Sequence, residues 1–297
     1  MWQMEQKSFG GPEVFERVEV PRPTPGPGEV LVRMVATSVN AADWKVRSGR
    51  IRQLGEPPLV LGLDLSGVVE AVGPGADRFV PGEAVYGVVF GGANAEYVVA
   101  QENRLARVPV SIDPVHAAAL PVAGLTAWQT LATVRAGERV LVHAAAGGVG
   151  HLAVQIAAHR GAAVAGTART DNHAYLRALG VSDPIDYRTT DFTTAITDVD
   201  LVLDLIGPDY TDRSLTVLSP TGRVIAAEGP DTHPDSRVER FRVDPNTADL
   251  EVLAAAIDRG ELTVDIAETL PITDLATAHR LSELGRVRGK IVLTANG

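Results

Sequence analysis

The chain has 297 residues, 45% of them hydrophobic and 22% charged, which is typical of a globular protein of one or two domains. Its formal net charge of −10 disfavours nucleic acid and anionic membranes as partners, and the lack of cysteine excludes disulfides, thiolate nucleophiles and cysteine-ligated zinc. The N-terminal segment has no apolar stretch typical of a signal peptide, and no apolar run is long enough to span a membrane, so we expect a cytoplasmic protein.

The first 112 residues are predicted to be rich in β-structure. Four prolines between residues 21 and 27 predict an extended lead-in, and the valine-rich segment 29–36 then predicts a strand. Short apolar runs follow at 66–72, 84–90 and 95–100, with glycine-containing turns between them. Several short strands joined by turns favour a small barrel over a parallel sheet.

Beyond residue 113 strands alternate with helices, which predicts βαβ units and a doubly wound parallel sheet. The expected strands are 140–142, 163–165, 185–187, 201–203 and 223–225. The expected helices are 149–160, 175–179, 250–259 and 274–284, followed by a last strand at 290–293.

A nucleotide site is predicted where the strand 140–142 leads through a glycine-rich turn into the helix 149–160. Alanine occupies the first position of a G-x-G-x-x-G pattern, at Ala145, and glycine occupies the other two, at 147 and 150. The N–H groups and the positive dipole end of the helix suit a pyrophosphate. The residues predicted to bind it are Ala146, Gly147, Gly148, Val149 and Gly150.

The end of the second strand of this unit predicts which cofactor binds. An NAD site usually carries an acidic residue there, but residues 166–168 contain none, and Arg169 follows. Thr167 and Arg169 are both predicted to bind the cofactor. Arginine suits a 2′-phosphate through paired, charge-assisted hydrogen bonds, so we expect NADP(H). Asp171 is the competing feature, although it lies beyond the expected position. His173 is a second candidate for the phosphate, and a solvated histidine at a helix start is the alternative.

These motifs, in this order, resemble the zinc-free quinone oxidoreductase (zeta-crystallin-like) family of the medium-chain dehydrogenase/reductase superfamily. The resemblance runs through nearly the whole chain, including the segments 25–30, 38–49, 62–69, 120–128, 144–150 and 289–293. It implies a GroES-like β-barrel domain at 1–113, a Rossmann domain at 114–266, and a return of 267–297 to the first domain. Asp64 lies where zinc-dependent members carry a Gly-His-Glu motif, and we interpret it as a turn or barrel residue.

The resemblance also implies roles for individual residues. Asn40, Asp43 and Lys45 lie in the motif that borders nicotinamide and substrate, and they are the expected catalytic residues. An alternative for Asp43 is a structural ion pair with Arg47. The residues expected to lie by the cofactor are Thr126, Tyr187 by the 2′-phosphate, and Gly207 in a loop on the nicotinamide side.

The expected function is an NADPH-dependent, zinc-independent reductase that transfers hydride to a quinone or an α,β-unsaturated carbonyl. Lys45 is one of only three lysines in an arginine-rich chain, and with Asn40 it is the expected donor to the substrate oxygen. An enoyl-thioester reductase and a non-catalytic NADPH-binding protein are the alternatives. The resemblance suggests a homodimer paired through the Rossmann sheet edge, which we place at 253–258 and 262–266.

Overall fold

The computed structural model describes residues 1–295, and the chain forms two compact units. Unit 1 contains residues 1–125 and 245–260 together with the segment that begins at Val264. Unit 2 contains residues 126–244 and 261–263. These bounds differ from the expected 1–113, 114–266 and 267–297, because the helices near residues 114–125 and 247–258 group with unit 1.

The strands of unit 1 are β1 (Trp2–Gln6), β2 (Phe15–Glu19), β3 (Glu29–Val39), β4 (Leu59–Val60), β5 (Asp64–Val72), β6 (Ala84–Val88), β7 (Tyr97–Gln101), β8 (Leu105–Arg107), β15 (Ile266–Pro271) and β16 (Lys290–Thr294). Its helices are α1 (Ala41–Arg47), α2 (Pro114–Ala117), α8 (Thr247–Asp258) and α9 (Leu275–Glu283), and α3 (Pro121–Thr130) runs from unit 1 into unit 2. Short 3₁₀ turns of this unit are η1 (Pro12–Val14), η2 (Glu102–Arg104) and η5 (Ile272–Asp274).

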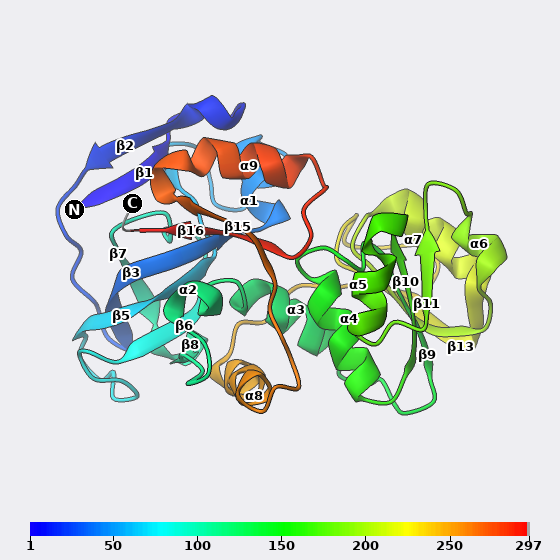
Figure 1. Ribbon diagram of the computed structural model, residues 1–297. Helices are drawn as coiled ribbons and strands as arrows, with labels where there is room; N and C mark the ends of the chain where they lie inside the picture. Colours follow the sequence, from blue (N-terminus) through cyan, green and yellow to red (C-terminus); the bar gives the residue numbers. More distant parts are fainter. Residues whose placement is uncertain (296–297) are drawn as a thin grey trace. The chain divides into compact units, whose positions relative to one another are not determined.

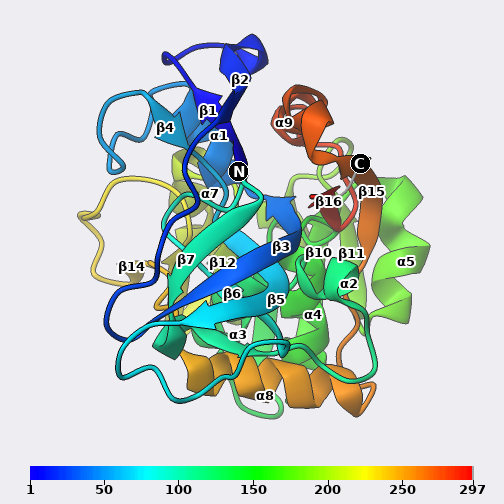
Figure 2. The ribbon, with the colours of Figure 1, turned by 90° about the vertical axis from the view of Figure 1, so that its left-hand side faces the viewer.

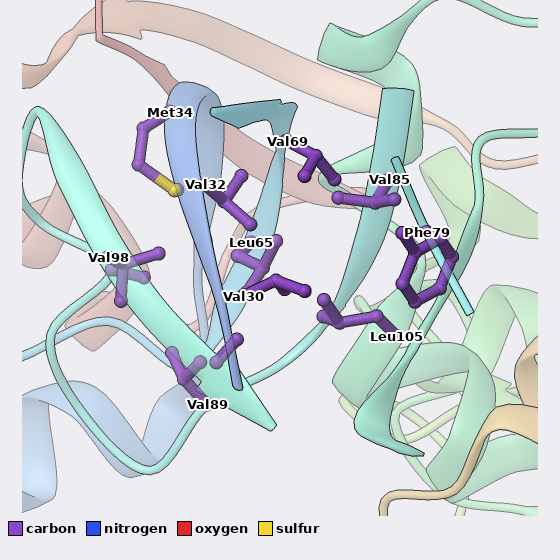
Figure 3. Packing of buried hydrophobic residues seen from close by; sticks show 12 residues of the cluster. Val30, Val32, Met34, Leu65, Val69, Phe79, Val85, Val89, Val98 and Leu105 are labelled. Atoms are coloured by element: carbon purple, nitrogen blue, oxygen red, sulfur yellow. The ribbon is translucent and has the colours of Figure 1, made fainter. Parts of the chain in front are cut away.

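The main sheet of unit 1 has the order β15-β16-β3-β5-β6-β8, and β7 also pairs with β3. Figure 2 shows β3 beside β5 and β7. The long strand β3 therefore has β5 on one side and both β7 and β16 on the other, so the C-terminal strand returns to the first unit. Alternate residues of β3, among them Val30 and Val32, point into an apolar core with Leu65, Val85 and Leu105 (Figure 3). Buried valine and leucine on short strands are what the sequence predicted for a barrel.

Unit 2 has the strands β9 (Arg139–Val142), β10 (Ala163–Ala168), β11 (Asp183–Asp186), β12 (Val199–Asp204), β13 (Leu218–Ala226) and β14 (Val238–Arg240). Its helices are α4 (Gly150–His159), α5 (His173–Ala178), α6 (Phe192–Ala195) and α7 (Pro208–Ser214), with the 3₁₀ turns η3 (Thr170–Asn172) and η4 (Leu215–Val217). All its strand pairs are parallel, in the order β11-β10-β9-β12-β13-β14, which is the 3-2-1-4-5-6 order of a Rossmann sheet. Figure 1 labels β9, β10, β11 and β13 of this sheet. A GroES-like barrel together with a Rossmann sheet confirms the predicted α/β fold class.

The contacts of helix α8 explain why the observed boundary between the two units differs from the expected one. Thr247 donates its hydroxyl to the carbonyl of Leu105 at 2.9 Å, and Tyr86 donates to the carbonyl of Leu250 at 2.6 Å. Helical periodicity predicts a helix there but cannot show which sheet the helix packs on. Leu253 and Ile257, placed at a dimer interface from the sequence, are buried in this helix. The edges of the Rossmann sheet are β11 and β14, so the segments expected to form the dimer contact do not lie at an edge of that sheet, and the location of a dimer contact stays a prediction.

Among the described residues, no helix combines the length and the apolar character that crossing a bilayer requires.

Candidate functional site

The predicted glycine turn joins β9 to α4 in unit 2. Gly147 donates its N–H to the carbonyl of Ala144 at 2.9 Å, which closes the turn. The next three N–H groups, those of Gly148, Val149 and Gly150, donate to no acceptor among the residues that the structure describes. Free N–H groups at the start of a ten-residue helix form the geometry that binds a phosphate anion.

Two close contacts explain which residues the turn accepts. A Cβ at Gly150 would lie 2.7 Å from the Cα of Ala145, so a side chain there would push the helix away from the strand. Ala145 itself holds the position that glycine usually fills. Its methyl group fits because the facing residue on β10 is Gly166, where a Cβ would approach the Cβ of Ala145 to 2.7 Å. Glycine at position 166 on the neighbouring strand thus leaves the space that the methyl group of Ala145 needs.

Thr167 supports the turn from inside the protein. It is 1% exposed, and its hydroxyl oxygen accepts the N–H of Ala144 at 3.2 Å. The same hydroxyl lies 3.2 Å from Nδ1 of His143, whose Nε2 lies 3.0 Å from the hydroxyl of Ser214. Burial, and then the charge of Arg213, lower the pKa of His143 to about 3, so the ring is neutral. The hydroxyl of Thr167 therefore shapes the turn from inside, and the predicted role of Thr167 in cofactor binding stays a prediction.

The three predicted ligands for the 2′-phosphate lie beyond the carboxyl ends of β10 and β11. Arg169 is half-buried directly after β10, and Tyr187 is 45% exposed directly after β11. His173 begins α5, and its Nε2 is buried without a hydrogen-bond partner in the described chain. Asp186 joins the two ends, because its carboxylate accepts the N–H of Thr170 at 3.0 Å. Parallel strands bring these residues to one edge of the sheet.

Gly207 follows β12 with φ of 128°, a conformation that favours glycine. Asp204 fixes this loop by accepting the N–H of Ile206 at 2.8 Å and of Gly207 at 3.2 Å. Burial raises the pKa of Asp204, and a short hydrogen bond from Thr211 opposes that shift. A cavity of about 250 Å³ lies beside the loop, with Thr211 and Arg240 in its lining. The other two residues expected by the cofactor, Thr126 and Ala146, are 7% and 6% exposed.

Asp43 organises the start of α1 in unit 1. One carboxylate oxygen accepts the N–H of Asn40 at 2.8 Å, and the other accepts the N–H of Gly62 at 3.2 Å. The side chain is 4% exposed, and burial raises its pKa to about 7. The alternative ion pair with Arg47 is wrong, because Arg47 pairs with Glu283 through a short contact. The structure gives Asp43 a positioning role at the N-terminus of α1.

Asn40 and Lys45 are both half-buried at opposite ends of this short helix. The Lys45 ammonium lies 5.4 Å from the centre of the Trp44 ring, in a cation–π contact. Asn40 makes side-chain contacts with Asp64 and Lys290, two buried residues that the sequence analysis did not place in the site. The scarcity of lysine was the one signal that could have drawn attention to Lys290.

No group of three potential metal ligands occurs among residues 1–295. Together with the absence of cysteine, this means that these residues do not fit a zinc centre.

Comparison with known proteins agrees with the fold. Residues 26–110 match the family model described as "Alcohol dehydrogenase GroES-like domain", and residues 179–293 match "Zinc-binding dehydrogenase". A 2-haloacrylate reductase from Burkholderia sp. is 35% identical over 96% of this chain and 96% of its own length. The quinone oxidoreductase structure from Coxiella burnetii has a TM-score of 0.94 and 33% identity, covering 100% of this chain and 99% of the other. The Escherichia coli quinone oxidoreductase complexed with NADPH has a TM-score of 0.91 and 27% identity, covering 99% and 100%.

The two units and these matches define an oxidoreductase of the medium-chain dehydrogenase/reductase type. Within that class, the chain belongs to the quinone oxidoreductase family. The predicted resemblance is thereby confirmed, and the NADPH held by the solved relative agrees with the predicted cofactor.

Proposed function

We propose that the protein binds NADPH in unit 2 and uses it to reduce a quinone or an alkene conjugated to a carbonyl group. The observation that carries this proposal is the glycine turn, with the free N–H groups of Gly148, Val149 and Gly150. Arg169 supplies a cation at the end of β10, where an NAD site would carry an acid. The pyrophosphate and the 2′-phosphate of NADPH supply the matching negative charges.

When bound, NADPH supplies hydride. A conjugated acceptor needs no metal, because the negative charge that forms on hydride addition moves onto its distant oxygen. The protein then has to orient the acceptor and donate hydrogen bonds to that oxygen. Asn40 and Lys45 are the donors that we assign to this role, and Asp43 positions Asn40 by accepting its backbone N–H.

The relatives support both kinds of acceptor. Quinone oxidoreductases and the 2-haloacrylate reductase share the family, and a 2-haloacrylate carries an alkene conjugated to a carboxyl group. Both substrates accept hydride at a carbon and develop charge on oxygen. We therefore propose the shared chemistry, reduction of a conjugated acceptor, as the activity of this chain.

The test is the oxidation of NADPH by the purified protein with a quinone, an enone, 2-chloroacrylate and an enoyl thioester. Turnover of the quinone or of one of the first two alkenes is expected, and it should survive prolonged treatment with a chelator. Activity confined to the thioester would replace the proposal with an enoyl-thioester reductase. Binding of NADPH without turnover of any substrate would identify a non-catalytic binding protein.

The matched variants are Asn40→Ala and Lys7→Ala. Asn40→Ala removes a proposed donor, so it should lower kcat while leaving NADPH affinity unchanged. Lys7 is 43% exposed, and in the described part of the chain its one ion pair is with Glu5, at 3.2 Å. Its replacement should leave both quantities unchanged.

We further propose that the protein is a cytoplasmic homodimer.

A further inference from the structure

A buried polar cluster connects three strands of unit 1 at the position of Asn40. Asn40 follows β3, Asp64 begins β5 and Lys290 begins β16. The register of the sheet brings them together, because Ile291 faces Val39 across β16 and β3. Lys290 is 3% exposed and Asp64 is fully buried.

Lys290 uses its ammonium group entirely within this cluster. Its Nζ lies 2.6 Å from Oδ1 of Asn40, 3.2 Å from the carbonyl of Val39 and 3.5 Å from Oδ2 of Asp64. Burying an ammonium and a carboxylate costs more free energy than burying apolar side chains of similar size. Since stability alone would favour an apolar pair here, the charged pair calls for a functional explanation.

Asp64 is surrounded by hydrogen-bond donors. Its Oδ2 accepts from Nδ2 of Asn40 at 2.8 Å and, through a short contact, from the hydroxyl of Ser38. Its Oδ1 accepts the N–H of Val122 at 2.7 Å. With the ammonium of Lys290, these donors hold the carboxylate in one orientation.

The two charged partners fix the Asn40 amide in one of its two possible orientations. An ammonium only donates, so the Asn40 atom beside Lys290 must be the oxygen. A carboxylate only accepts, so the atom beside Asp64 must be the nitrogen. The nitrogen carries two N–H groups and uses one of them for Asp64. The second has no acceptor among residues 1–295, and the side chain is only half-buried.

We propose that Lys290 and Asp64 are positioning residues that hold the Asn40 amide so that its second N–H donates to the oxygen of the substrate. This inference rests on the proposed function, in which Asn40 is a donor to that oxygen. A donor that is already oriented needs no reorganisation when charge develops, so its loss should be felt in kcat more than in KM. Neither positioning residue needs to touch the substrate for this effect.

Kinetics test the consequence through a double-mutant cycle. Lys290→Met keeps the length of the side chain and removes its three donors, and we expect it to lower kcat by about tenfold or more. In an Asn40→Ala background the same change should lower kcat by less than about twofold, because the group on which Lys290 acts is already gone. An equal loss in both backgrounds would mean that Lys290 acts on stability alone and would overturn the proposal. Lys7→Met is the matched control and should leave kcat unchanged.

An NMR measurement tests the positioning without any turnover. The side-chain amide signal of Asn40, assigned by its disappearance in Asn40→Ala, should be distinct and slowly exchanging in the wild-type protein. It should move to the position of a free amide in Lys290→Met and stay unchanged in Lys7→Met. A signal unchanged in Lys290→Met would refute the positioning role even if the reductase activity is established. If the wild-type protein turns over no substrate, the proposed function fails, and this signal still decides whether Lys290 orients Asn40.

Lys290→Met leaves the Asp64 carboxylate buried without its cation, which threatens folding. The double variant Lys290→Met/Asp64→Asn removes both charges and is the form to use if the single variant unfolds. The proposal expects the double variant to fold, to bind NADPH with wild-type affinity and to lose at least about tenfold in kcat. Wild-type kcat in this variant would overturn it.

Discussion

Ala145 and Gly166 face each other closely, and there is room for a methyl group at only one of the two positions. This gives a prediction that depends on a single contact. A Cβ added at Gly166 would lie 2.7 Å from the Cβ of Ala145, and its next neighbour, Cγ1 of Val181, is at 3.7 Å. Gly166→Ala should therefore destabilise the fold by about 1–3 kcal/mol through overpacking. Ala145→Gly in the same chain removes the opposing methyl group and should recover most of that loss, which gives a coupling energy of about 1–3 kcal/mol.

The assay is urea unfolding of the wild type, the two single variants and the double variant. NADPH affinity, followed by fluorescence, should change in the same order, because Ala145 is in the turn whose N–H groups we assign to the pyrophosphate. A loss of about 1.4 kcal/mol in binding corresponds to tenfold in affinity. Additive effects of the two substitutions would refute the reasoning, since the clash would then not be between these two methyl groups. Weakened binding in Ala145→Gly alone, without any rescue, would show that the alanine contributes to the turn for another reason.

Four further predictions follow from the site and the fold. Arg169→Ala should weaken NADPH binding about tenfold or more and leave NADH binding unchanged, and fluorescence titrations with equal wild-type affinities for both cofactors would contradict the assignment. Lys45→Ala should lower kcat/KM for a conjugated acceptor by up to about 10²–10³, with poor rescue by Lys45→Arg, and wild-type kcat/KM in the alanine variant would remove Lys45 from the mechanism. Burial lowers the pKa of His143 and His279 to about 3, so the unfolded chain takes up protons below about pH 6.5 that the folded chain does not. Each histidine should therefore lower the stability measured by urea unfolding as the pH drops from about 6.5 towards 3, by up to about 1.4 kcal/mol per pH unit. Asp43, whose pKa burial raises to about 7, opposes this trend between about pH 7 and 4, so the decisive range is below about pH 4, where a flat profile would contradict the neutral burial of the histidines. Light scattering at micromolar concentration should give the mass of a homodimer, and a monomer mass would reject the dimer.

Local patterns allowed most of the architecture to be predicted. The strand, turn and helix at 139–159 could be predicted from apolar periodicity and from the glycines between the strand and the helix. The short helix α1 was not predicted as an element, although its residues were singled out through the family resemblance. Its seven residues are too few for a clear helical period, and its start depends on the carboxylate of Asp43.

The contacts of two polar side chains, Thr167 and Arg47, depend on partners that local sequence patterns do not reveal. Thr167 is among the residues predicted to bind the cofactor, and the sequence does not reveal that its hydroxyl lies 3.2 Å from Nδ1 of His143 and accepts the N–H of Ala144. An ion pair of Arg47 with Asp43, which is four residues away on the same helix, was the alternative interpretation. The partner of Arg47, Glu283, is instead on α9, 236 residues along the chain.

The sequence by itself determined the Rossmann turn, the missing acid at the end of β10 and the absence of thiolate chemistry, because each depends on residue type and short spacing. Only the tertiary structure decided how Asn40 is held. Asp64 and Lys290 are 226 residues apart and meet because β5, β3 and β16 are neighbours in one sheet. Periodicity predicts that each of these segments is a strand, but pairing between distant strands is set by the packing of the whole unit. An amide that needs a cation on one side and a carboxylate on the other can therefore be recognised only after the fold is known.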